Sequence, residues 1–116
     1  MGISFYDFEN LHHETFRQRI LERFKTIVET GQFIDGEYNK KFEDEFAKMQ
    51  GSKHCLLVAN GTDAIEISLK VSGVGIGDRV AVPGITFYAT AEAVLNIGAI
   101  PVFVDVNYDT GLIGDL

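Results

Sequence analysis

Four consecutive residues, Asn60, Gly61, Thr62 and Asp63, have the types and spacing to bind an anion, and they follow a short apolar run at 55–58. A helix that begins at this turn leaves its first N–H groups without intrahelical partners and carries a partial positive charge there. Gly61 lets a phosphate approach the backbone, and the Thr62 hydroxyl can donate a hydrogen bond to it. The alternative is that Asn60 or Thr62 only caps the helix. The turn therefore predicts either a phosphate site or a plain helix start.

The acidic residue of this turn, Asp63, is unfavourable beside a phosphate if its carboxylate points inward. We therefore expect its backbone N–H to face the ligand and its side chain to turn elsewhere. Residues 60–62 also form a glycosylation sequon. The opening segment 1–10 carries Asp7 and Glu9 and lacks the apolar run of a secretory signal, so we do not expect glycosylation.

Two adjacent aromatic residues, Phe87 and Tyr88, follow a second apolar run at 79–82. Ligands of open α/β sheets bind beyond the carboxyl ends of the strands. A ring at this position can therefore stack on a planar ligand held by the neighbouring turn. The alternative, from spacing alone, is that both rings pack in the core.

Other candidate motifs are less specific. The glycine-rich stretch 73–78 follows a predicted helix and precedes a predicted strand, the reverse of a dinucleotide-binding loop, so it predicts a tight connection. Asp105 lies near the end of the last predicted strand and is either functional or a loop-forming residue. We expect no metal site, because four potential ligands lack the required spacing: His12, His13, His54 and Cys55.

The composition limits the possible partners. Ten basic residues against 17 acidic residues give a net charge of −7, which argues against nucleic acid and against a polybasic membrane anchor. The longest uncharged runs, 80–91 and 93–104, are shorter than the roughly 18–20 residues of a transmembrane helix. The single Cys55 excludes an internal disulfide and fits a reducing compartment. We therefore predict a cytoplasmic protein.

The elements that position these residues follow from hydrophobic spacing. Apolar residues from Phe16 to Val28 recur at helical intervals and predict a helix capped by Gly31. A second helix is predicted at about 39–49, before Gly51, with a loop at 32–36 between the two. Beyond them, short apolar strands alternate with helices, in the order strand 55–58, helix 61–71, strand 79–82, helix 86–97 and strand 100–106. This alternation predicts right-handed crossovers and a parallel sheet.

The predicted organisation is a single partial domain over 1–116, with an N-terminal helical segment at 1–51 and a βαβαβ part at 52–116. Three strands make a thin sheet, and parallel strands need cover on both faces and neighbours at both edges. The architecture therefore predicts a doubly wound α/β domain cut short, which exposes apolar surface and self-associates.

Many motifs, in order along the chain, resemble those of one family. They are Gly36, 42–47, Gly51, 60–64, 77–80, Pro83, 86–90, 98–99 and 101–106. Together they resemble the N-terminal third of the DegT/DnrJ/EryC1/StrS family of pyridoxal-phosphate-dependent nucleotide-sugar aminotransferases. The resemblance implies the N-terminal part of the large domain of the type I aminotransferase fold, and an active site at a homodimer interface.

The same resemblance implies pyridoxal 5'-phosphate as cofactor. Gly61, Thr62 and Asp63 match the turn that binds its phosphate, and Phe87 matches the aromatic residue that stacks on its ring. No catalytic residue is implied here, because the Schiff-base lysine and the acid that pairs with the ring nitrogen lie later in the family's sequences. We therefore expect these 116 residues alone to be inactive. None of the lysines matches the catalytic position: Lys25, Lys40, Lys41, Lys48, Lys53 and Lys70.

The implied parent enzyme transfers an amino group from glutamate to the keto group of a nucleotide-linked sugar, for polysaccharide or amino-sugar biosynthesis. The Gly-Thr-Asp-Ala form of the turn and the run 89–92 favour a 3-keto sugar over a 4-keto sugar. Two alternatives stay open. One is a pyridoxal-phosphate-dependent sugar dehydratase of the same family, and the other is a non-catalytic truncated remnant that only binds phosphate ligands.

Overall fold

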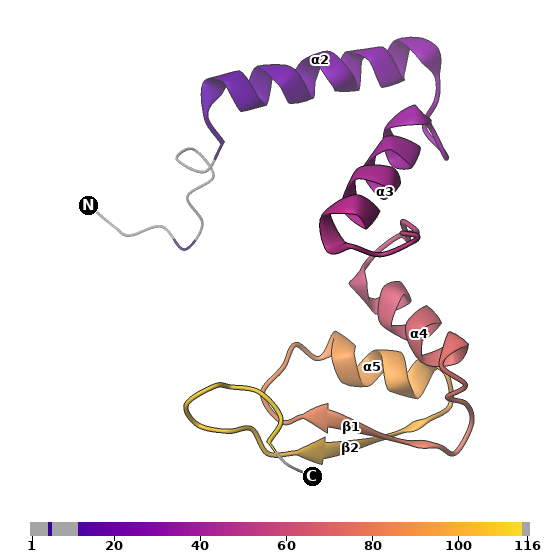
Figure 1. Cartoon of the computed structure of the whole chain (residues 1–116), viewed down its shortest axis with the longest axis vertical. Helices are drawn as coiled ribbons and strands as arrows, with labels where there is room; N and C mark the ends of the chain where they lie inside the picture. The colour runs from indigo at the N-terminus through magenta and orange to yellow at the C-terminus, as the bar shows by residue number, and fades with distance from the viewer. Residues whose placement is uncertain (1–4, 6–11, 115–116) are drawn as a thin grey trace. The chain divides into compact units, whose positions relative to one another are not determined.

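The structure is a computed structural model that describes residue 5 and residues 12–114 of the 116-residue chain (Figure 1). The chain divides into two compact units, Met1–Leu56 and Leu57–Leu116. That the two units belong to a single domain stays a prediction.

The first unit contains two amphipathic helices, α2 (Glu14–Thr30) and α3 (Glu37–Gln50). They end at Gly31 and Gly51, which adopt left-handed φ angles of 69° and 65° and donate their N–H groups back to the last turns. Glycine reaches this conformation without the steric cost that a Cβ brings. Both predicted helices and the loop at 32–36 are therefore confirmed.

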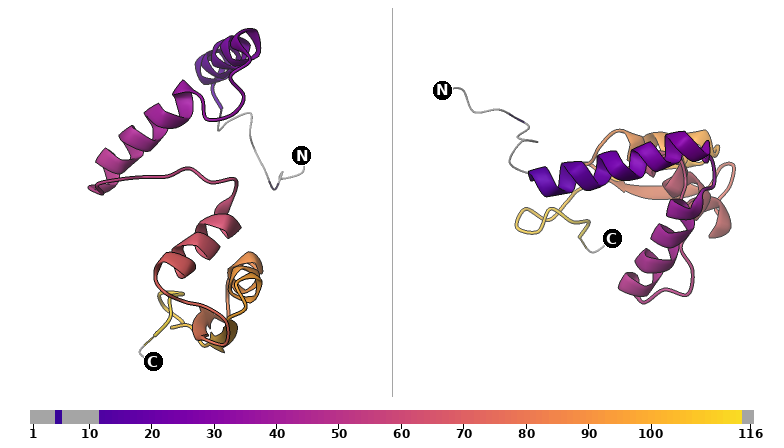
Figure 2. Two further views of the ribbon diagram at one scale, coloured as in Figure 1. Left: turned by 90° about the vertical axis from the view of Figure 1, so that its right-hand side faces the viewer. Right: turned by 90° about the horizontal axis from the view of Figure 1, so that it is seen from above.

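The second unit contains α4 (Gly61–Val71), β1 (Arg79–Pro83), α5 (Ala89–Asn96) and β2 (Ile100–Val104). The two strands pair in parallel, in a register that runs from Arg79 opposite Ile100 to Pro83 opposite Val104. The Gly84 N–H continues the ladder with a 2.8 Å hydrogen bond to the Val104 carbonyl. Figures 1 and 2 show α5 running back across the strands, as a parallel pair requires.

The core of this unit is small and lies between α5 and the sheet. Val82, Val94, Ile97 and Ala99 are buried together. Partly buried apolar residues surround them, namely Leu69, Val74, Val80 and Ala91. α4 packs against α5, and α5 in turn packs against both strands. A 2.7 Å hydrogen bond from Asn96 Nδ2 to Glu66 Oε1 also joins the two helices.

The prediction of a strand at 55–58 is wrong, because these residues have no regular secondary structure. In the part of the chain that the structure describes, the sheet has two strands, β1 and β2. The βαβαβ prediction thus reduces to βαβ preceded by α4. A strand requires a neighbouring backbone to share its ladder, and the two strands of the described sheet, β1 and β2, pair with each other. Leu56, which an interior strand would bury, is 74% exposed.

Two other boundaries differ from the predictions. α5 begins at Ala89 rather than at residue 86, because the chain first crosses from the end of the sheet to the start of the helix. β2 ends at Val104 rather than at residue 106, and Val106 instead forms an isolated antiparallel bridge with Ile113. This bridge closes a turn in which the Asn107 side chain accepts the N–H groups of Asp109 and Thr110.

Candidate phosphate- and cofactor-binding site

Asn60 caps α4 with its side chain. Its backbone is extended, with φ −161° and ψ 177°, and its Oδ1 atom accepts the Asp63 N–H at 2.9 Å. An asparagine at this position satisfies one of the N–H groups that the first turn leaves unpaired. The capping interpretation is therefore confirmed for Asn60.

The cap does not use all the donors at this end of the helix. Ala64 donates to the Asn60 carbonyl at 3.2 Å, which is the first bond of the helical series. In the part of the chain that the structure describes, the N–H groups of Gly61 and Thr62 and the Thr62 hydroxyl form no hydrogen bond with the protein. These three donors lie at the positive end of the helix dipole, a set that fits a phosphate.

The Asp63 side chain turns into the cap. Asn60 Nδ2 donates to Asp63 Oδ2 at 3.2 Å, so the carboxylate is held by the same amide that accepts the Asp63 N–H. The expectation that this side chain turns aside is met. Its N–H, which we expected to face a ligand, donates to Asn60 instead.

Phe87 and Tyr88 lie between β1 and α5 and are 69% and 68% exposed. The alternative that both rings pack in the core is therefore wrong. Their ring centroids lie 4.4 Å apart at an interplanar angle of 49°. The Phe87 carbonyl accepts the Thr90 N–H at 3.0 Å, and the hydroxyls of Thr86 and Thr90 are 3.0 Å apart. The backbone that carries Phe87 is thus fixed, while its ring is open to a ligand.

The two helices of the second unit begin at the same end of the sheet. In Figure 1, α4 and α5 both start toward the carboxyl ends of β1 and β2. Gly61 and Thr62 are the first two residues of α4, and Phe87 precedes α5. This is the edge at which open α/β sheets bind ligands.

The remaining candidates have structural roles in the described residues. Asp105 accepts the Val106 N–H at 2.8 Å through Oδ1 and is exposed, as a loop-forming residue is. The stretch 73–78 is the tight connection predicted, with Asp78 Oδ2 accepting the Gly75 N–H at 2.8 Å. Over the described residues, no three potential metal ligands of the His, Cys, Asp and Glu types cluster, and no helix is long and apolar enough to cross a membrane.

Sequence reasoning missed two features of the site, although both left a signal. Asn60 and Asp63 have the spacing of a capping box, in which the first residue and the one three positions later satisfy each other. Thr86 and Thr90 lie either side of the start of α5, where Ser and Thr hydroxyls commonly form local hydrogen bonds.

The unit combines an α/β fold, a phosphate-type turn at the start of α4 and an exposed aromatic residue after β1. This combination fits the class of aminotransferases predicted above. The sequence matches the profile of the DegT/DnrJ/EryC1/StrS aminotransferase family over residues 14–115, and the chain belongs to this family. The predicted resemblance is thereby confirmed.

Two curated relatives are similar over most of the chain. The UDP-2-acetamido-2-deoxy-3-oxo-D-glucuronate aminotransferase of Pseudomonas aeruginosa is 40% identical over 105 residues, which cover 90% of this chain and 29% of the relative. The UDP-N-acetyl-3-dehydro-alpha-D-glucosamine 3-aminotransferase of Acidithiobacillus ferrooxidans is 44% identical over 96 residues, which cover 83% of this chain and 26% of the relative. The chain therefore spans less than a third of the length of either relative.

A solved structure gives the same fold. The crystal structure of NtdA from Bacillus subtilis, with the cofactor PMP bound, matches with a TM-score of 0.83 and 32% sequence identity. The match covers 90% of this chain and 24% of that one. The α/β fold class predicted for the chain, part of an aminotransferase fold, is therefore confirmed.

Proposed function

We propose that this chain supplies the cofactor-phosphate end of a pyridoxal-phosphate-dependent enzyme that transfers an amino group to the keto group of a nucleotide-linked sugar. The observation that carries the proposal is the first turn of α4, where Gly61 and Thr62 offer three donors to an anion. Family membership supports the reaction class, and the PMP bound to a structural relative supports the cofactor.

Each site residue has a specific role in this proposal. Gly61 and Thr62 bind the cofactor phosphate through their N–H groups and the Thr62 hydroxyl, as charge-assisted hydrogen bonds. Phe87 covers one face of the ring and excludes water from it. When bound, the cofactor supplies the electron sink that lets an amino group move between two carbonyl carbons.

We propose that the catalytic lysine is not among these 116 residues and that they are inactive alone. All six lysines of the chain are exposed, and Lys25 and Lys41 lie 3.7 Å and 4.0 Å from Glu29 and Glu45. A lysine that acts as a nucleophile is typically desolvated or placed beside another cation, so that its neutral form is populated. None of the six is desolvated in the described residues.

The substrate of the parent enzyme is proposed to be a 3-keto nucleotide sugar, with glutamate as amino donor. The turn sequence favours this sugar class, and the two relatives described above are named for 3-oxo or 3-dehydro sugars linked to UDP. A homodimer and a cytoplasmic location complete the proposal. Offering 3-keto and 4-keto substrates to the whole enzyme tests the sugar class, and activity on the 4-keto substrate alone would contradict it.

The direct test of the phosphate site is the substitution Thr62→Ala. It removes one charge-assisted donor, and we expect the affinity for pyridoxamine phosphate to fall by about 1–3 kcal/mol. Thr62→Ser retains the hydroxyl and should keep most of the affinity. Calorimetric titration with pyridoxamine phosphate and, in parallel, with pyridoxamine isolates the phosphate contribution. Equal affinity of the Thr62→Ala variant and the wild type for pyridoxamine phosphate would overturn the assignment.

A further inference from the structure

Asn60 and Asp63 form a reciprocal pair at the start of α4. The Asn60 carbonyl oxygen Oδ1 accepts the Asp63 backbone N–H at 2.9 Å, while Nδ2 of the same amide donates to the Asp63 carboxylate at 3.2 Å. Aspartate at position 60 could accept the N–H but could not donate to a carboxylate. An amide side chain is therefore what makes both bonds possible.

This pair matters because Asp63 carries a negative charge one residue from the proposed phosphate donors. A carboxylate in the first turn suits the helix dipole, but it repels a phosphate bound at the same end. The bond from Asn60 Nδ2 holds the carboxylate at the cap. The bond to Asn60 Oδ1 removes the Asp63 N–H from the donors that a ligand can use.

We propose that Asn60 is a positioning residue for the phosphate site and that it acts through Asp63. By fixing both polar groups of Asp63 in the cap, it leaves the phosphate to Gly61 and Thr62 and keeps the Asp63 charge from the anion. This inference rests on the proposed function, since it takes the cofactor phosphate as the ligand. Helix capping and phosphate binding are then complementary properties of one turn.

The discriminating variant is Asn60→Asp. Aspartate is as good an N-cap as asparagine, so the helix keeps its acceptor for the Asp63 N–H. The donor to the carboxylate is lost, and two like charges face each other. We expect the affinity of the whole protein for pyridoxamine phosphate to fall about tenfold or more, the scale of a charge-assisted contact, at unchanged far-ultraviolet circular dichroism.

Two further variants distinguish the effect of losing the Asn60–Asp63 pair from the effect of the negative charge that Asn60→Asp adds. Asp63→Asn removes the carboxylate and should bind pyridoxamine phosphate at least as well as the wild type. The double variant Asn60→Asp with Asp63→Asn exchanges the amide and the carboxylate and rebuilds the pair. We expect it to recover most of the affinity that Asn60→Asp loses. A double variant as weak as Asn60→Asp would overturn the inference, because the charge at position 60 would then explain the loss.

Amide shifts give a readout that does not depend on catalysis. Titration with pyridoxamine phosphate should move the N–H resonances of Gly61 and Thr62 strongly and that of Asp63 weakly. A dominant shift at Asp63, or unchanged affinity in Asn60→Asp, would overturn the inference while the Thr62→Ala result still supported the proposed function. Absence of any phosphate-dependent binding in the wild type would instead reject the proposed function itself.

Discussion

At the scale of single residues, Phe87 keeps a large apolar ring exposed, as several other aromatic residues of the chain do, but it lies at the carboxyl end of β1, where open α/β sheets bind ligands. Its carbonyl accepts the Thr90 N–H, and its ring lies against that of Tyr88. Leaving such a ring in water forgoes the roughly 1.5–3 kcal/mol that full burial of a large apolar side chain contributes. A ligand that covers the ring recovers part of this free energy, which is consistent with a stacking role.

We expect Phe87→Ala to weaken the binding of pyridoxamine phosphate by about 1 kcal/mol beyond lost burial, the typical contribution of aromatic stacking. Thermal stability should change little, because the ring is 69% exposed. Tyr88→Ala is the matched control, since Tyr88 is 68% exposed and loses the same contact between the two rings. Equal losses of affinity in both variants would show that the ring pair, rather than Phe87, supports the site. Calorimetric titration measures both.

At the same scale, the sequence predicted candidate residues for the site but not how their polar groups are paired. The choice between capping and phosphate binding could not be made for the Asn60 turn, because both use the same N–H groups. In the structure the Asp63 N–H bonds to the Asn60 cap, while those of Gly61 and Thr62 form no hydrogen bond with the described residues, so capping leaves donors for a ligand. Such a division depends on side-chain rotamers, which residue type and spacing do not determine.

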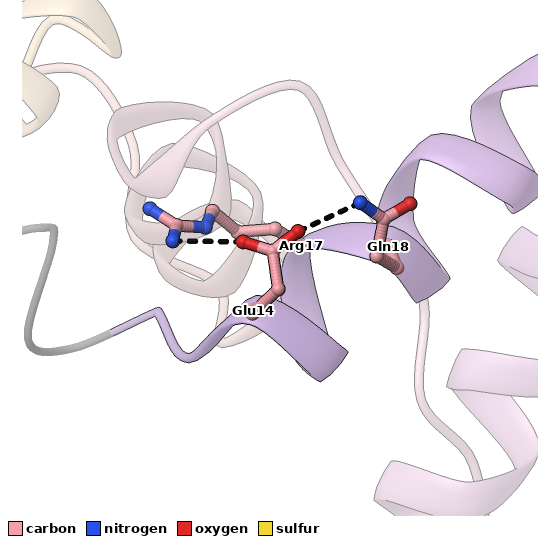
Figure 3. Close-up of polar contacts among 3 residues, drawn as sticks. All are labelled: Glu14, Arg17 and Gln18. Atoms are coloured by element: carbon pink, nitrogen blue, oxygen red, sulfur yellow. Dashed lines mark hydrogen bonds and ion pairs between the residues drawn. The ribbon is translucent and has the colours of Figure 1, made fainter.

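At the scale of elements, the first turn of α2 contains a small polar network. Glu14 accepts hydrogen bonds from Gln18 Nε2 at 2.7 Å and from Arg17 at 2.9 Å (Figure 3). The Gln18 hydrogen bond, followed by the hydrogen bond and charge of Arg17, lowers the pKa of Glu14 below its ordinary value. An ionised carboxylate in the first turn also suits the helix dipole.

The lowered pKa gives a definite sign to the pH dependence of α2. Because the carboxylate is more acidic in the helix than in the unfolded chain, its contribution is fully present above the unfolded pKa. It is lost as the pH falls through the lowered pKa of the folded state. We expect the helix content of α2 to fall over this acidic range, and Glu14→Gln to remove that part of the pH dependence.

An NMR titration that follows the carboxyl carbon of Glu14 tests whether the Gln18 hydrogen bond lowers the pKa of Glu14. Gln18→Ala should raise the pKa of Glu14 toward its ordinary value, whereas Gln50→Ala, a change at the far end of α3, should leave it unchanged. High salt should also raise it, because Glu14 is exposed and the Arg17 charge is screened there. A Glu14 pKa that does not respond to Gln18→Ala would contradict the role of this hydrogen bond.

The connection between α5 and β2 offers a test of backbone constraint. Gly98 has a φ of 79°, and a Cβ added there would lie 2.9 Å from Ile76 Cγ1. Gly111 has a similar φ of 67°, but a Cβ added there would meet no atom within 4 Å. Alanine at either position must adopt a left-handed φ, which costs about 1–2 kcal/mol. At Gly98 the Ile76 side chain must also move away from the new Cβ.

We therefore expect Gly98→Ala to lower the free energy of unfolding more than Gly111→Ala, by about 0.5–1.5 kcal/mol, the cost of moving the exposed Ile76 side chain off its preferred rotamer. Ile76→Ala, added to Gly98→Ala, should remove the difference, because it deletes the atom that the new Cβ meets. Denaturant unfolding of the three variants measures these terms. Equal destabilisation at the two glycines would show that Ile76 moves aside freely.

Helices and strands could be predicted from the sequence where the features that determine them lie within the segment itself. Apolar spacing and terminal glycines were enough for α2 and α3, and the alternation of apolar runs was enough for β1, α5 and β2. The strand at 55–58 failed because a strand also needs a partner, and a partner is a property of the surrounding chain rather than of the four residues. The apolar character of that segment is real, but no described strand pairs with it.

At the scale of the whole molecule, many large apolar side chains are exposed to solvent. α2 has no buried residue. Five apolar residues on it are 46–60% exposed, namely Phe16, Ile20, Leu21, Phe24 and Val28. In the second unit, Phe103 of β2 is 64% exposed and Ile100 is 50% exposed. Contiguous apolar surface of this kind marks an interaction site or causes association.

We therefore expect the 116-residue chain to self-associate in sedimentation velocity, although its net charge of −7 opposes association. Phe24→Glu places a charge on the apolar stripe of α2 and should shift the distribution toward monomer. Lys25→Glu is the matched control, because it changes the net charge by twice as much at the adjacent residue, which pairs with Glu29 at 3.7 Å. If net charge governed association, Lys25→Glu would have the larger effect; if the apolar stripe governs it, Phe24→Glu will. A monodisperse monomer for the unmodified chain would contradict the expectation, since the exposed rings would then be tolerated in water.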